Sequence, residues 1–135
     1  MMTLFDAPDR ESSCVMRSRT NTSLQSLGLL NETQRVEIAR SLADRLLRDK
    51  STDEQRLVRL FRMLTCSDPI KAQLDACINL LNRSRKRYSE TSEDAAQLVA
   101  TGDAQRDETI AATELAAWTH LTTIVLASDA AITLY

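Results

Sequence analysis

The stretch that decides the fold runs from residue 31 to residue 50 and reads NETQRVEIARSLADRLLRDK. Its apolar residues recur at steps of three and four positions, the spacing that places side chains on one face of an α-helix. They are Val36, Ala39, Leu42, Ala43, Leu46 and Leu47. Arg40, Asp44 and Arg48 recur every four residues and are expected on a polar flank. The stretch therefore predicts an amphipathic helix that begins after the N-cap Asn31.

A shorter helix is expected just before this one, over residues 23–30. Thr22 or Ser23 suits its N-cap, because a hydroxyl oxygen can accept from the free backbone N–H groups of a first turn. Gly28 weakens the helix by about 1 kcal/mol relative to alanine. Since the segment is rich in leucine, we expect it to be brief and mostly buried. The leucines are Leu24, Leu27, Leu29 and Leu30.

Further along the chain, cap and turn residues separate four more helical patterns. The cluster at residues 51–54 restarts a helix, and Pro69 fits the first position of the next one. Gly102 stands where the end of a fifth, short helix needs a left-handed residue. The last helix is expected from about Thr113. Trp118, the largest apolar side chain on it, should lie at the centre of the packing.

These patterns predict an all-α protein, an irregular bundle of about five to six helices preceded by an extended N-terminal arm. Residues 1–22 form the expected charged arm, and residues 23–135 form the helical domain. The composition agrees, because two prolines and two glycines in 135 residues leave few turn signals for a many-stranded sheet.

Charge and composition exclude several function classes. With 17 basic and 19 acidic residues the formal net charge is −2, so no overall field attracts nucleic acid. Residues 121–135 are the most apolar stretch, yet they are shorter than the roughly 20 residues of a membrane span. The first residues lack the basic and apolar regions of a signal peptide. The three cysteines show no metal-ligand or haem-attachment spacing, so no cofactor is expected in this chain.

Charged residues gather in the arm, where no helix organises them. The arm is either an ion-paired strap laid over the helices or a binding loop, since clustered carboxylates and guanidinium groups can hold anionic or sugar ligands. The strap is the favoured reading. The candidate interaction residues are Asp6, Asp9, Arg10, Glu11, Arg19 and Asn21.

The single histidine, His120, is the one candidate for general acid–base catalysis. No nucleophile or orienting carboxylate is placed near it by sequence spacing, so a structural position on its helix is favoured. Catalytic residues and metal ligands are therefore not assigned.

A dense basic run lies near the end of the fourth expected helix. It either binds phosphate or is a solvated helix end, where basic side chains suit the helix dipole. The second reading is favoured. The run consists of Arg83, Arg85, Lys86 and Arg87.

Two blocks of sequence carry a resemblance to a known family. The first is FDAPDRE at residues 5–11, followed by RTNTSLQ at residues 19–25 and LLN at residues 29–31, and the second is ELAAWT at residues 114–119. With them the chain resembles the C-terminal part of the planctomycete-type domain of unknown function number fifteen fifty-three. The resemblance implies a large exported parent protein of the cell envelope, which often also carries a cytochrome-c-like haem domain. Haem would then belong to the full-length parent and not to this chain.

The function expected from these observations is a non-catalytic helical module for packing or interaction, a fragment of a large exported multidomain protein. Its partners would be the upstream domains of that parent or another protein. The alternative is that the charged arm contributes to an active site completed by the missing upstream domains. The chain alone is not expected to be an enzyme, and its substrate and oligomeric state do not follow from the sequence.

Overall fold

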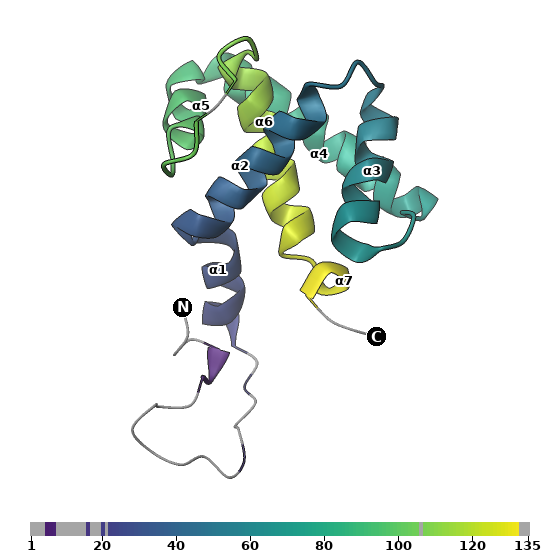
Figure 1. Ribbon diagram of the computed structural model, residues 1–135, viewed down its shortest axis with the longest axis vertical. Helices are drawn as coiled ribbons and strands as arrows, with labels where there is room; N and C mark the ends of the chain where they lie inside the picture. Colours follow the sequence, from purple (N-terminus) through teal and green to yellow (C-terminus); the bar gives the residue numbers. More distant parts are fainter. Residues whose placement is uncertain (1–4, 8–15, 17–19, 21, 106, 133–135) are drawn as a thin grey trace.

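All regular structure in the described part of the chain is helical (Figure 1). The structure is a computed structural model that describes residues 5–7, 16, 20, 22–105 and 107–132. The expected all-α class is confirmed. The helices are α1 Ser23–Asn31, α2 Thr33–Leu47, α3 Asp53–Thr65, α4 Lys71–Glu90, α5 Ser92–Val99, α6 Ala112–Leu126 and α7 Asp129–Ile132.

The centre of the molecule is α6, which α2, α4 and α5 surround (Figure 1). Glu114 is its one acidic residue, and apolar or small side chains cover nearly all of its circumference, as in a helix buried on every side. Trp118 is fully buried, as expected, and its Nε1 donates to the Glu114 carboxylate at 3.0 Å. Leu46, Leu57 and Leu81 bring α2, α3 and α4 into the same core.

Two of the three residues expected on the polar flank of α2 are buried, and the third, Arg48, is exposed. Arg40 is 4% exposed and Asp44 is 8% exposed, because the connection between α5 and α6 lies over them. Asp44 accepts from the backbone N–H of Asp107 at 3.3 Å, and Glu37 accepts from that of Ala104 at 2.6 Å. The sequence periodicity therefore predicted that these side chains share one flank of the helix, but it did not predict that the connection between α5 and α6 covers part of that flank.

Two helix starts also differ from expectation. Asn31 is not an N-cap but the last residue of α1, and its Nδ2 donates to the carbonyl oxygen of Leu27 at 3.2 Å. The N-cap of α2 is Glu32. Pro69 precedes the first helical position of α4 by two residues, because the N-cap is Ile70. The preceding Asp68 accepts from Arg62 at 2.5 and 3.0 Å.

The first helix begins as predicted but is not mostly buried. Thr22 caps it, accepting from the Gln25 N–H at 3.3 Å while the Gln25 side chain accepts from the Thr22 N–H at 3.0 Å. Beyond this start, α1 projects past the end of α2, away from the other helices, and packs mainly on α2 (Figure 1). Among the described helices, α2 is therefore the main one that covers α1.

Candidate functional site

Of the candidate arm residues, Asp6 is the one that the structure describes. Asp6 Oδ2 accepts from the backbone N–H and the hydroxyl of Thr20 at 2.8 and 2.6 Å. The Thr20 hydroxyl oxygen in turn accepts from Gln25 Nε2 at 3.0 Å. The Asp6 carboxylate thus connects the start of the arm to the first turn of α1. The other candidates lie outside the described residues: Asp9, Arg10, Glu11, Arg19 and Asn21.

His120 has a hydroxyl partner that sequence spacing did not predict. Its Nδ1 lies 3.0 Å from Ser84 Oγ, which joins α6 to α4. The Tyr88 ring meets the imidazole edge to face, with the ring centroids 6.5 Å apart. Burial lowers the pKa of His120, and the positive charge of Arg87 adds to the effect. Ser84 and His120 are 36 positions apart in the sequence, which explains why no local pattern pointed to the pair.

This pair lacks two requirements of a catalytic serine. Within the described residues no carboxylate hydrogen-bonds to His120, so nothing orients the ring as in a triad. Ser84 is 3% exposed, which closes its hydroxyl to a substrate. The arrangement is suited to holding α4 against α6.

The basic run lies inside α4 and is partly neutralised by carboxylates. Arg85 Nε and Nη2 donate to the two oxygens of Glu114 at 2.9 and 2.5 Å, and Nη1 donates to Asp53 at 2.7 Å. The hydrogen bond from Arg85 holds the pKa of the Asp53 carboxyl below its usual value. Arg87 lies over the Tyr88 ring, 5.5 Å from its centroid. Arg85 therefore serves helix packing and is not available to phosphate.

The described residues show no group of three or more histidine, cysteine, aspartate or glutamate side chains that could hold a metal ion. Over the same part of the chain, none of the helices combines the length and the apolar character needed to cross a membrane.

The feature that stands out is the uncovered side of α1. Leu24, Leu27 and Leu30 follow one another at three-residue steps and are 60%, 54% and 40% exposed. No residue of α1 is charged. The exposed side therefore combines three leucines with uncharged polar residues, Ser23, Ser26 and Asn31, a more apolar composition than a solvent-facing helix side usually has.

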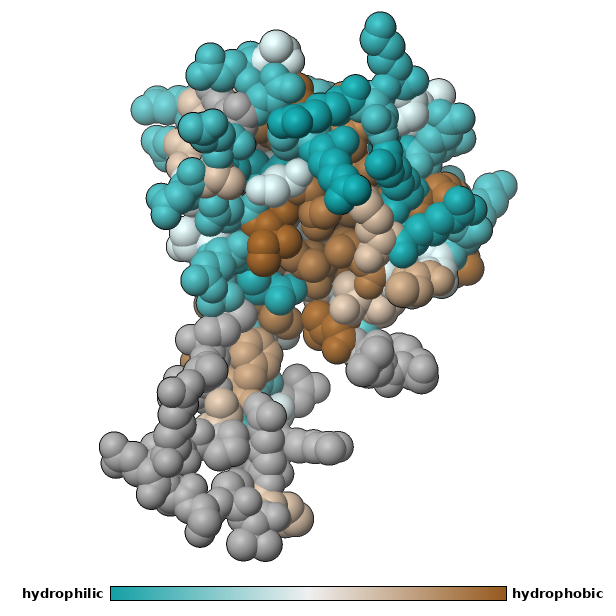
Figure 2. Space-filling view, in the orientation of Figure 1, coloured by the Kyte–Doolittle hydropathy of each residue, from teal (hydrophilic) through white to brown (hydrophobic). Residues whose placement is uncertain are grey.

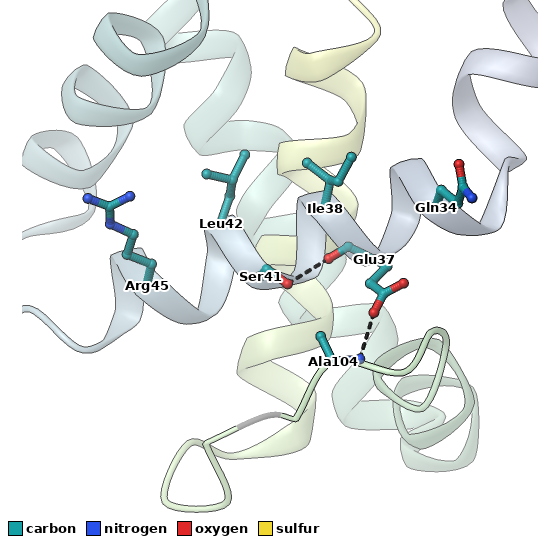
Figure 3. A pocket seen from close by; sticks show the side chains of 7 residues that line it. All are labelled: Gln34, Glu37, Ile38, Ser41, Leu42, Arg45 and Ala104. Atoms are coloured by element: carbon teal, nitrogen blue, oxygen red, sulfur yellow. Dashed lines mark hydrogen bonds between the residues drawn. The ribbon is translucent and has the colours of Figure 1, made fainter.

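A shallow groove of about 560 Å³ lies along the outer face of α2, the helix that follows α1 in the chain (Figure 3). Ile38 is 51% exposed, and Figure 3 shows it and Leu42 on the same side of the helix. Arg45, at the far end, forms no hydrogen bond or ion pair with another described side chain. The groove is lined by Gln34, Glu37, Ile38, Ser41, Leu42, Arg45 and Ala104.

Hydrophobic surface also gathers in the middle of the face drawn in Figure 2, where α2 and α6 lie in Figure 1. Ile124 of α6 and Ile132 of α7 are 37% and 51% exposed. We call the set Leu24, Leu27, Leu30, Ile38 and Leu42 the α1–α2 surface. Sequence periodicity identified the leucines of this set as apolar helix residues but not Ile38, and it did not predict that the leucines of α1 are exposed.

The family described as "PSD1: Protein of unknown function (DUF1553)" matches residues 1–81, a range that includes the whole α1–α2 surface. No curated protein and no solved structure matches the chain.

Proposed function

Since the chain belongs to the PSD1 family of proteins of unknown function (DUF1553), we propose that it is a non-catalytic helical module that packs against another polypeptide. The observation that carries the proposal is the uncharged helix α1, with three leucines 40% to 60% exposed. Fully burying one leucine side chain stabilises a protein by roughly 2 kcal/mol. Since the three leucines are about half exposed, a partner that covers all of them would gain about 3 kcal/mol.

The partner in this proposal is the remainder of a larger parent protein. Residues 1–135 would be the C-terminal portion of a larger domain, with residues 1–22 as a charged arm and residues 23–135 as the helical part. The parent would be a large exported multidomain protein, and any haem would be held elsewhere in it.

The charged arm is the weaker basis for a function. Its one described candidate, Asp6, already accepts two hydrogen bonds from Thr20. A carboxylate used in this way is less suited to binding a substrate, which supports a packing role over a contribution to an active site.

The test compares residues 1–135 alone with a version extended upstream along the natural reading frame. We expect the extension to raise the urea midpoint of the helical domain and to reduce its binding of a dye for exposed apolar surface, because α1 becomes covered. A version extended by a Gly/Ser linker of equal length is the control. A reading frame that starts at Met1, or an extension with the same effect as the linker, would contradict the proposal.

A further inference from the structure

A polar hollow lies between the C-terminal part of α4 and α5, at the end of the fold away from α1 (Figure 1). Its volume is about 420 Å³, within the range of pockets that hold small molecules. We propose that this hollow binds a small neutral polyhydroxyl compound, such as a monosaccharide or an inositol. The proposal goes beyond the packing role of the chain and does not depend on it. The hollow is lined by Arg87, Tyr88, Asp94, Gln97, Leu98 and Thr101.

Tyr88 supplies a hydroxyl group that has no hydrogen-bond partner among the described residues, although the residue is only 5% exposed. Burial raises the pKa of this hydroxyl, and the charges of Arg87 and Asp94 act on it as well, so the group lies close to both. In the described part of the chain, Thr122 Oγ1 is the side-chain atom that is fully enclosed without a partner. The Tyr88 hydroxyl is therefore not enclosed and opens into the hollow, where a ligand can satisfy it.

The position of this hydroxyl is fixed by the packing of its ring. His120 of α6 meets the Tyr88 ring edge to face, with the centroids 6.5 Å apart. Arg87 lies over the same ring, 5.5 Å from its centroid. A ligand therefore meets the hydroxyl and not the ring faces, and it binds by hydrogen bonds to a group that needs no further ordering.

The other polar groups of the hollow offer donors and acceptors without a net charge. Arg87 Nη2 and Asp94 Oδ2 lie 3.6 Å apart, too far for a hydrogen bond, so both side chains keep bonding capacity for a ligand. The Gln97 amide forms no hydrogen bond with the described residues. Since the two charges cancel, the hollow favours a neutral ligand over a phosphate or a carboxylate. A polyol suits it, because each hydroxyl both donates and accepts.

The experiment follows the amide signals of residues 1–135 by two-dimensional NMR while myo-inositol, D-glucose or D-galactose is added. We expect at least one of the three to give saturable shifts at Gln97, Leu98 and Thr101, with a dissociation constant of about 1–10 mM, because an open site supplies only a few hydrogen bonds. The amides of α1 should not shift. Sodium phosphate and glycine are the charged comparisons and should give no saturable shift below about 50 mM.

Tyr88→Phe keeps the ring and should weaken binding by at least about fivefold, because it removes one hydrogen bond. Gln97→Ala, at an exposed position of α5, should weaken it as well and serves as the second variant if Tyr88→Phe disturbs the packing. Arg87→Gln should also weaken binding. Lys86→Gln removes the same charge from an exposed neighbour outside the lining and should not.

Three results would overturn the proposal. The first is the absence of a saturable shift with all three polyols. The second is saturable binding of phosphate or glycine without binding of a polyol, which would assign the hollow to a charged ligand. The third is an affinity that Tyr88→Phe and Gln97→Ala leave unchanged while both variants keep the amide spectrum of the folded chain.

Discussion

Arg40 of α2 caps the C-terminal end of α5, because its Nη1 donates to the carbonyl oxygen of Val99 at 2.6 Å. Its Nη2 donates to the carbonyl oxygen of Ala104, beyond the helix, at 2.5 Å. The last carbonyl groups of a helix have no partner within it, and a positive charge there is favoured by the helix dipole. One buried guanidinium thus joins two segments about 60 residues further along the chain.

Arg40→Met should destabilise the fold by about 2–4 kcal/mol, because it leaves the buried carbonyl oxygen of Val99 without its donor and also removes the partly buried hydrogen bond to Ala104. The measurement is the free energy of unfolding in urea, with Trp118 as the fluorescent reporter. Arg45→Met is the matched control on the same helix, since Arg45 is exposed and should change stability by less than about 0.5 kcal/mol. Equal effects of the two substitutions would show that the Val99 contact contributes little.

A double-mutant cycle on Arg85 and Glu114 should give a coupling energy of about 1 kcal/mol, a value reduced for the 32% exposure of both side chains. Arg85→Met and Glu114→Gln are the single changes. The Arg62–Asp68 pair is the control, because it has similar geometry but side chains 64% and 62% exposed. That pair should show no measurable coupling. Similar coupling in both pairs would mean that burial does not set their strength.

The sequence was sufficient to predict features that depend on local spacing. Thr22 capped its helix as expected, Gly102 adopted a left-handed φ of 86°, and Trp118 took the centre of the core. Caps, turns and apolar stripes are set by residues a few positions apart, so they can be read without the fold.

Two local predictions were wrong, the N-cap Asn31 and the helix start at Pro69. The other features that were missed depend on which distant segment covers a face. Nothing near Arg40 in the sequence shows that the connection after α5 will lie over it. In the same way, the leucines of α1 predict an apolar face but not whether this chain supplies its cover. The Ser84–His120 contact was missed for the same reason, as its two residues come from different helices.

His120 should make stability depend on pH near neutrality. Burial lowers its folded pKa below the usual 6.5, so the unfolded chain binds the extra proton more readily. The contribution of His120 to stability is therefore fully present above pH 6.5, and it is lost as the pH falls from 6.5 toward the lowered pKa of the folded state. The lowered pKa of Asp53 acts separately, since its contribution is lost only below about pH 3.8.

This prediction is tested by measuring the urea midpoint at several pH values from about 7.5 to about 5.5, a range around the reference pKa of histidine. His120→Asn should flatten the dependence, because the amide keeps a polar partner for Ser84 but does not titrate. Since the chain has one histidine, a slope that persists in this variant would assign it to another group.

Alanine at the two glycines should have opposite effects on stability. Gly102 has a φ of 86°, and a Cβ there would lie 2.5 Å from Cδ of Glu37, so Gly102→Ala combines backbone strain with a clash. We expect a loss of about 1–3 kcal/mol. Gly28 lies inside α1, where alanine should stabilise by up to about 1 kcal/mol. Urea unfolding of both variants measures whether each substitution raises or lowers the free energy of unfolding. A stabilising effect of Gly102→Ala would show that the connection after α5 does not hold Gly102 against Glu37.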